Sequence, residues 1–200
     1  MEIAKDKQVY SVGNLIVAPR LPRPWVEVAW ERMTRENLLD VVFYEEACDR
    51  SWFIKQHLLP ECTVFGCFEK GLDTDVNFCG WGRVSPYSMG RGHWKGEISV
   101  CFFREYQRRQ FTLPFATMMI EWTFDNLVLK CLFGSTPEPN VPMLKFIKAL
   151  GFEGTRVPCF TTWKGEPCGI FLSWMTKERW RKLGEDARPP NHALGVEAKK

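Results

Sequence analysis

The pattern of apolar and polar positions predicts strands and helices over most of the chain. Alternation at Trp25–Glu31 predicts a strand, and apolar residues at helical spacing after Thr34 predict a helix over 35–46 capped by Thr34. A second helix is expected at Ser51–Leu59, where Pro60 ends it. The remaining expected elements are, in order, the strands Cys62–Glu69, Val76–Val84 and Glu97–Phe103, the helix Leu113–Leu127, the strand Leu127–Phe133, the helix Val141–Leu150, the strands Thr155–Thr162 and Gly169–Trp174, and the helix Lys177–Leu183.

Turn and cap residues separate these elements. Gly71–Asp75 and Lys164–Glu166 are typical of turns between paired strands, and Ser85–Lys95 is typical of a loop. Thr112 is a candidate N-cap, and Gly151 is a candidate helix C-cap. The order of elements lacks a regular strand–helix–strand alternation, which predicts a mixed α/β layer.

The two ends of the chain differ from its middle. Residues 1–24 end in a segment with three prolines, Pro19–Pro24, which predicts an extended leader or edge segment. Residues 184–200 are polar and have no apolar period, which predicts a tail. We therefore expect one domain at 25–183, between the leader and the tail.

Composition and charge exclude some classes of protein. Hydrophobic residues make up 45% of 200 residues, enough to build a core. No stretch approaches the roughly 18 apolar residues of a membrane span, and Met1–Gln8 has no apolar signal region. A net charge of +3 does not indicate a specific nucleic-acid binder. We expect a cytoplasmic protein without a membrane partner, and the nine tryptophans suggest a surface for protein partners.

Cysteines and histidines give no sign of metal or triad chemistry. No pair of the eight cysteines has the C-x2-C spacing, which argues against a zinc site. Most of them lie in apolar, strand-like runs and are interpreted as buried, reduced thiols. The histidines His57, His93 and His192 occupy unrelated segments and are interpreted as incidental surface or loop residues.

Three segments resemble the GNAT superfamily of acetyl-CoA-dependent N-acyltransferases. Asn140–Phe152 is similar to the family's N-x-x-S-x-x-x-x-E-K-x-G-F helix, and Gly165–Trp180 resembles its closing hairpin and T-x-E-x-W end. Glu97–Thr112 resembles the fourth strand and the pyrophosphate loop Q/R-x-x-G-x-G/A, with Gln107 at the first loop position. The resemblance implies a GNAT fold: a central, mixed, mostly antiparallel sheet flanked by helices.

The resemblance also implies a site for acetyl-CoA as co-substrate. In such a loop, backbone N–H groups at a helix N-terminus point at the phosphates. Gln110 and Thr112 stand where the family has glycines, and their side chains are expected to crowd the pyrophosphate. Arg104, Arg108 and Arg109 either supply positive charge or are only a solvated approach to the helix. The implied cofactor-binding residues are Phe102, Gln107, Arg108, Arg109, Gln110, Thr112 and Asn140.

The implied chemistry is attack of an amine on a thioester carbonyl. Glu97 matches the family's base on the fourth strand, and an exposed strand-start carboxylate is the alternative interpretation. Ile147 occupies the position of the family's acid, a Tyr, so Tyr87 and Tyr106 are possible substitutes. Two further family positions, a Ser and an Asp, are here Met143 and Gly169.

Two functions stay open at this point. The first is an acyl-CoA-dependent N-acyltransferase that acts on a primary amine of a protein or small molecule. The second is a catalytically inactive GNAT-fold protein that serves as a structural or assembly component, for example of a bacteriophage virion, with protein partners. An enzyme should have an open slot between its fourth and fifth strands, whereas Gln110 or Phe111 would fill that slot in a structural protein.

Overall fold

An eight-stranded sheet forms the centre of the protein. The computed structural model describes residues 10–43, 48–71, 76–87 and 94–186. The strand order is β1-β2-β3-β4-β5-β6-β8-β7, and every neighbouring pair is antiparallel except β5–β6. This confirms a mixed, mostly antiparallel sheet. The strands are β1 (Tyr10–Val12), β2 (Leu15–Pro19), β3 (Thr63–Lys70), β4 (Val76–Tyr87), β5 (Lys95–Phe102), β6 (Cys131–Pro137), β7 (Glu153–Trp163) and β8 (Glu166–Thr176).

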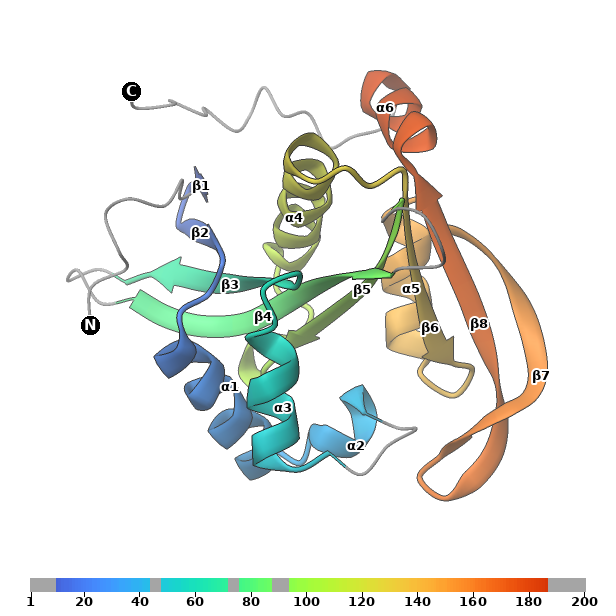
Figure 1. The fold of residues 1–200 in the computed structure, drawn as a ribbon, viewed down its shortest axis with the longest axis horizontal. Coiled ribbons are helices and arrows are strands. Elements are labelled where there is room, and N and C mark those ends of the chain that lie inside the picture. Colours follow the sequence, from blue (N-terminus) through green and yellow to red (C-terminus); the bar gives the residue numbers. More distant parts are fainter. Residues whose placement is uncertain (1–9, 44–47, 72–75, 88–93, 187–200) are drawn as a thin grey trace.

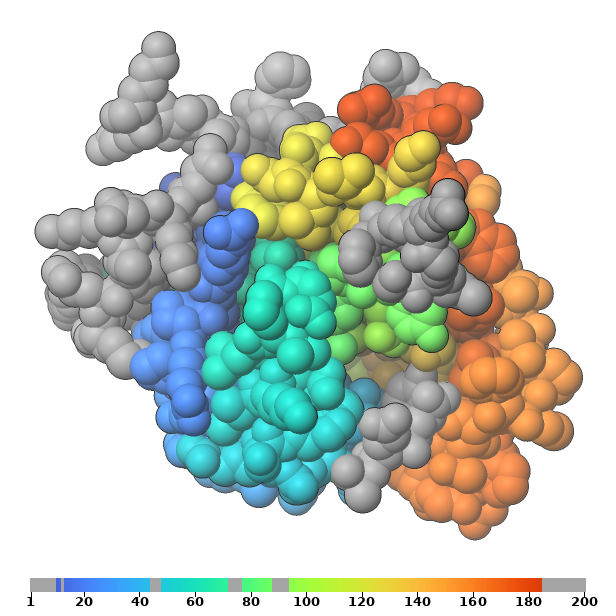
Figure 2. All heavy atoms as spheres, in the orientation of Figure 1, coloured from blue at the N-terminus to red at the C-terminus, as the bar shows by residue number. Residues whose placement is uncertain are grey.

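Helices cover both faces of this sheet. α1 (Arg23–Arg35), α2 (Leu39–Val42) and α3 (Arg50–His57) lie on one side of the strands β2–β5, and α4 (Thr112–Asn126) lies on the other (Figure 1). α5 (Val141–Ala149) shares the face of α4, because the ring of Phe102 contacts both Phe115 and Phe146. In Figure 2 the face with α1 and α3 is seen in blue to teal, and β7 forms the orange edge. No helix among the described residues is long and apolar enough to span a membrane.

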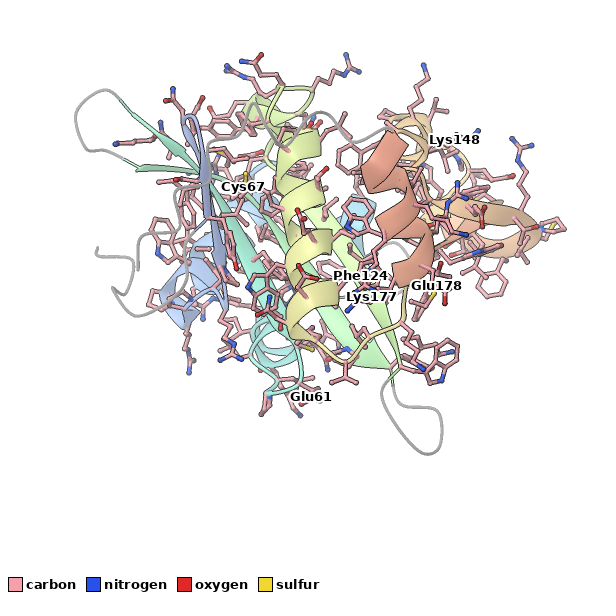
Figure 3. The ribbon with its side chains drawn as sticks, turned by 90° about the horizontal axis from the view of Figure 1, so that it is seen from above. Glu61, Cys67, Phe124, Lys148, Lys177 and Glu178 are labelled. Carbon is pink, nitrogen blue, oxygen red and sulfur yellow. The ribbon has the colours of Figure 1, made fainter. Side chains whose placement is uncertain are left out.

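α6 (Lys177–Asp186) follows β8 and is joined to the end of α4. The Lys177 ammonium donates a hydrogen bond to the backbone oxygen of Phe124, and Figure 3 shows these two residues side by side. A cation at a helix C-terminus satisfies a carbonyl and complements the helix dipole. The backbone N–H of Arg179 donates to the hydroxyl of Thr176, 3.1 Å away, so Thr176 opens α6.

The predicted strand Trp25–Glu31 is wrong, because these residues form the middle of α1. Its buried residues Val26, Ala29 and Met33 lie on one helical face. Pro22 is the N-cap and Pro24 lies in the first turn, where a proline's missing N–H has no cost. The alternating polarity of these seven residues fits the period of a strand and also that of a helix. The prolines at the start of the segment favour the helix.

The predicted helix over 35–46 is also wrong in its bounds. Thr34 lies inside α1, where its hydroxyl donates to the backbone oxygen of Trp30 at 2.9 Å instead of capping a new helix. Asn37 has a φ of 52°, which ends α1, and α2 has only four residues. Residues 44–47 lie outside the described residues.

Part of the expected leader is strand. β2 pairs with β3 from Leu15 to Pro19, and β1 pairs with β2. The division of the chain into leader, domain and tail stays a prediction, and residues 1–9 and 187–200 lie outside the described residues.

Several other element bounds differ from the predictions. Phe111, not Thr112, is the N-cap of α4, and β6 begins at Cys131 rather than Leu127. β4 extends to Tyr87 within the predicted loop. The predicted turn at 71–75 lies outside the described residues except for Gly71.

The C-cap predicted at Gly151 is confirmed. Gly151 has a φ of 82°, and its N–H donates to the oxygen of Lys148 at 2.9 Å. The N–H of Phe152 donates to the oxygen of Ile147 at 3.1 Å, which completes a Schellman motif. This motif fixes the direction in which the chain leaves α5 for β7.

The interpretation of His57 as a surface residue is wrong. His57 is 3% exposed and lies on the buried face of α3, because it follows Phe53 by four residues. Its ring centroid lies 3.8 Å from that of Phe53 and 4.8 Å from that of Trp81. His93 and His192 lie outside the described residues. The interpretation of buried thiols holds for Cys67, Cys79 and Cys101, whereas Cys159 is exposed.

Candidate functional site

A slot opens where the parallel strands β5 and β6 separate. β5 and β6 pair over three positions, from Lys95 with Cys131 to Glu97 with Phe133. Beyond Glu97 each strand keeps only its outer neighbour: β5 pairs with β4 as far as Phe102, and β6 pairs with β8 as far as Pro137. The two strands therefore form a V with its vertex at Glu97.

The V encloses a cavity of about 350 Å³. Its walls are the separated parts of β5 and β6, the first turns of α4, most of α5 and the apolar residues around α2. The residues that line it are Leu38, Val41, Val42, Ile98–Phe102, Gln107, Arg108, Thr112, Ala116, Gly134–Pro137, Asn140, Pro142, Met143, Phe146, Ile147, Leu150, Phe152 and Ser173.

Backbone polar groups of β5 face this cavity. The N–H of Phe103 donates to the oxygen of Cys79 on β4 at 3.0 Å. Since alternate residues of a strand direct their N–H and C=O groups to opposite sides, Ile98, Val100 and Phe102 direct theirs into the slot. The Gln107 amide donates to the oxygen of Phe102 at 3.0 Å, which satisfies the last of these carbonyls.

The N-terminus of α4 and the loop before it form the mouth of the slot. The N–H and the hydroxyl of Thr112 both donate to the oxygen of Arg109, at 3.1 and 3.0 Å, which fixes the turn into the helix. Arg108 has a φ of 63° and lines the slot. A helix N-terminus carries partial positive charge and N–H groups without intrahelical partners. The mouth is therefore suited to an anion.

Asn140 starts the helix on the other side of the mouth. Its side-chain oxygen accepts a hydrogen bond from the N–H of Met143 at 3.3 Å, so Asn140 is the N-cap of α5. The next turns of α5 place Met143 and Ile147 in the wall of the slot.

Solved structures of acetyltransferases share this architecture. No family model matches the chain, and no curated protein is similar to it in sequence. The ribosomal-protein-S5-alanine acetyltransferase of Vibrio fischeri superposes with a TM-score of 0.69 at 14% identity, covering 86% of this chain and 98% of that one. The spermidine N-acetyltransferase of Vibrio cholerae, in complex with CoA and spermine, superposes with a TM-score of 0.69 at 12% identity, covering 84% of this chain and 98% of that one. A GNAT-family acetyltransferase of Bacillus anthracis superposes with a TM-score of 0.67 at 12% identity, covering 86% of this chain and 99% of that one.

The fold is that of the GNAT acetyltransferases. Within this GNAT fold, five of the eight sequence-predicted site residues line the slot, namely Phe102, Gln107, Arg108, Thr112 and Asn140. Glu97, Arg109 and Gln110 do not line it. The roles of all eight stay predictions.

Of the side chains expected to obstruct the slot, Gln110 and Phe111 lie elsewhere, whereas Thr112 lines it. Gln110 is exposed, and the ring of Phe111 packs 6.1 Å from that of Tyr106. Neither Gln110 nor Thr112 has a positive φ, so the backbone of this loop does not require glycine at either position. The residue in the left-handed region is Arg108.

Glu97 lies at the vertex of the V. It pairs with Ser85 of β4 and Phe133 of β6 and is half-buried. By strand alternation its side chain is on the same face of β5 as Ser99 and Cys101, both of which line the slot. Glu97 is two strand positions from Ser99, which lines the cavity.

Neither tyrosine considered as an acid lines the slot. Tyr106 is buried, 5.7 Å from the Arg32 guanidinium, and Tyr87 is half-exposed beside Lys95. Burial raises the pKa of the Cys101 thiol to about 12, and the carboxylate of Glu36 adds to this. Cys101 is therefore a neutral thiol in the wall and not a nucleophile near pH 7.

Sequence reasoning missed the wall formed by Leu38, Val41 and Val42. The apolar residues after Thr34 were interpreted only as one side of a helix, and nothing in their spacing indicates a slot. It also missed an ion-pair network that holds the loop after β5. The Glu36 carboxylate accepts from the N–H of Arg104 at 2.6 Å and from the Arg32 guanidinium at 3.1 Å.

Glu36→Ala should lower the free energy of unfolding by about 1–3 kcal/mol, because it removes charge-assisted bonds that are only partly solvated. The side chain of Glu36 is 15% exposed. Urea denaturation measures the change. The matched control is Glu27→Ala on α1. The partners of Glu27, Arg23 and Arg50, are 68% and 53% exposed, so we expect this variant to lose less than about 1 kcal/mol of its free energy of unfolding. Equal losses in both variants would contradict an anchoring role for Glu36.

Proposed function

We propose that this protein is an acyl-CoA-dependent N-acyltransferase that acts on a primary amine. The observation that carries the proposal is the open slot between β5 and β6, whose mouth combines a helix N-terminus with Arg108. A slot of this kind suits a long, narrow ligand with an anionic end. The GNAT fold and the similarity to solved N-acetyltransferases support the same conclusion.

The residues present fit a CoA thioester, with acetyl-CoA as the reference ligand. Arg108 would hold the pyrophosphate at the mouth, beside the first turn of α4. The inward-facing N–H groups of Val100 and Phe102 would bind the amide-containing arm along β5. Gln110 does not line the slot and leaves room for these contacts.

The reaction needs no covalent enzyme intermediate. The thioester supplies an activated carbonyl carbon, the amine nitrogen forms a C–N bond to it, and the C–S bond breaks. The amine loses one proton and the departing thiolate gains one, which gives an amide and free CoA. We assign proton removal to Glu97, directly or through water, because its side chain lies on the face of β5 opposite α4 and α5.

The alternative, a structural or assembly component, stays a hypothesis. A slot filled by Gln110 or Phe111 would have supported it, and neither residue lines the slot. The open slot therefore favours the acyltransferase.

Binding of acetyl-CoA, measured by calorimetry, tests the proposal through a matched pair of variants. Arg108 and Arg109 are adjacent, exposed and equally charged, but only Arg108 lines the slot. Arg108→Glu should weaken binding roughly 10- to 100-fold, the value of about one charge-assisted contact, whereas Arg109→Glu should weaken it only a few-fold. No binding to the wild-type protein at millimolar acetyl-CoA would reject the proposed function, and equal effects of the two variants would reject the assignment of Arg108.

A further inference from the structure

We propose that the amine accepted by this protein also carries a carboxylate, which the ammonium of Lys95 binds. This inference rests on the proposed function and names the class of its acceptor. The site is the surface of β4, β5 and β6 on the side of Glu97, where these strands are still paired.

Lys95 and Glu97 lie on one face of β5, because alternate residues of a strand share a face and are about 7 Å apart. Their partners on the neighbouring strands lie on the same face. Tyr87 of β4 pairs with Lys95, and Phe133 of β6 pairs with Glu97. The ring centroids of Tyr87 and Phe133 are 5.9 Å apart, which agrees with a shared face. A group bound at Lys95 would therefore lie next to the proposed base.

Three aromatic rings hold the Lys95 ammonium in place. Its nitrogen lies 5.1 Å from the ring centroid of Tyr87, 5.7 Å from that of Trp94 and 5.5 Å from that of Phe133. Ring faces attract a cation within about 6 Å, so the half-buried lysine is held against the sheet. An ammonium has three N–H donors, and it can bond a carboxylate while the rings attract it.

The charges of this surface favour an anion over a second cation. The charged residues of β4, β5 and β6 are Arg83, Lys95 and Glu97, and all three share this face. The Arg83 guanidinium donates to the hydroxyl of Ser85 at 2.5 Å, and Ser85 pairs with Glu97. Two cations therefore flank one carboxylate. Lys95 would repel an acceptor with a second ammonium and would attract one with a carboxylate.

The reacting end of a bound thioester would face this site. With the phosphates at Arg108, the arm of CoA follows β5 inward past Phe102 and Val100 toward the vertex at Glu97. The amine nitrogen loses a proton to Glu97 and forms the C–N bond, the C–S bond breaks, and the thiolate gains a proton. The carboxylate of the acceptor does not react. Held at Lys95, it orients the amine toward the carbonyl carbon.

Steady-state acylation of three matched amines with acetyl-CoA tests the inference. 4-Aminobutyrate, butylamine and 1,3-diaminopropane share an aminopropyl group and end in a carboxylate, a methyl group and an ammonium, respectively. We expect kcat/KM to be roughly tenfold higher for 4-aminobutyrate than for butylamine, the effect of about one charge-assisted bond, and lowest for 1,3-diaminopropane. An equal or lower value for 4-aminobutyrate than for butylamine would overturn the inference. A preference for 1,3-diaminopropane would also overturn it and would indicate that the rings bind an ammonium of the acceptor.

Lys95→Met tests whether this side chain causes the preference. Methionine keeps an unbranched chain against the rings but has no charge, so the ratio of kcat/KM between 4-aminobutyrate and butylamine should fall to about one. The control Lys130→Met makes the same change at an exposed residue next to Cys131, the partner of Lys95 on β6, and should keep the ratio. A ratio that survives in Lys95→Met would overturn the placement of the carboxylate.

Failure of the proposed function has a separate readout. No binding of acetyl-CoA in calorimetry would overturn both the proposed function and this inference. Acetyl-CoA that binds and acylates none of the three amines would overturn the inference and leave the CoA site standing.

Discussion

Glu97→Gln should lower kcat roughly 10²- to 10⁴-fold, the usual contribution of a positioned general base. Glutamine keeps the size and hydrogen-bonding capacity of the side chain but cannot take a proton from the amine. Glu97 is half-buried at the vertex of the V, next to the paired positions of β5 and β6. We therefore expect acetyl-CoA affinity and the melting temperature to change little. The measurement is the rate of free CoA release with an amine that the wild-type protein accepts.

Two comparisons make this result specific. Glu166→Gln, at the exposed start of β8, makes the same chemical change far along the chain from the slot and should leave kcat unchanged. The pH profile of kcat/KM should also lose its acidic limb in Glu97→Gln, because a base no longer titrates. A variant with wild-type turnover would remove Glu97 as the base and turn the search to water alone.

Acid should destabilise the wild-type protein more than it destabilises His57→Phe. Burial and, to a smaller extent, the nearby Arg83 together lower the pKa of His57 to about 3, although the hydrogen bond to the Phe53 oxygen opposes both effects. The unfolded chain has the ordinary pKa of about 6.5. Between pH 6.5 and about 3, the unfolded state therefore binds a proton at His57 that the folded state does not bind. The contribution of neutral His57 to the free energy of unfolding is complete above pH 6.5, and it is lost as the pH falls toward about 3.

The expected difference is large. Between pH 7 and pH 4 the wild-type protein should lose about 3 kcal/mol more of its free energy of unfolding than His57→Phe loses. Phenylalanine preserves the ring between Phe53 and Trp81 and has no titratable group. Urea denaturation of both proteins at the two pH values measures the difference. The same pH dependence in both proteins would show that His57 protonates without cost in the folded state.

Elements with a signal inside one helical turn were predicted correctly, whereas an element whose polarity pattern fits both a strand and a helix was not. The helix after Asn140 and its Gly151 cap were predictable because an N-cap side chain and a left-handed C′ residue act within one turn. Trp25–Glu31 was ambiguous, since seven residues with apolar positions in alternation also place Val26, Ala29 and Met33 on one helical face. The prolines at the start of this segment favour a helix, but the alternation of polarity was interpreted as a strand.

The site was predictable to the extent that it belongs to contiguous segments. Gln107, Arg108 and Thr112 come from one loop, and Asn140 starts one helix, so a motif in the chain indicated each of them. Their assembly around a cavity depends on where β5 and β6 separate. No short segment encodes that separation, because it results from pairing with β4 on one side and β8 on the other.

By itself the sequence determined the α/β class, most strands and helices, the C-cap of α5 at Gly151 and the resemblance to GNAT proteins, because these depend on local periodicity and short motifs. Only the tertiary structure decided that Gln110 and Phe111 do not line the slot, that Leu38, Val41 and Val42 form part of its wall, and that His57 is buried. Each of these depends on contacts between residues far apart in the chain. Side-chain direction in a loop and burial on a short helix are set by those contacts and not by the residues nearby in sequence.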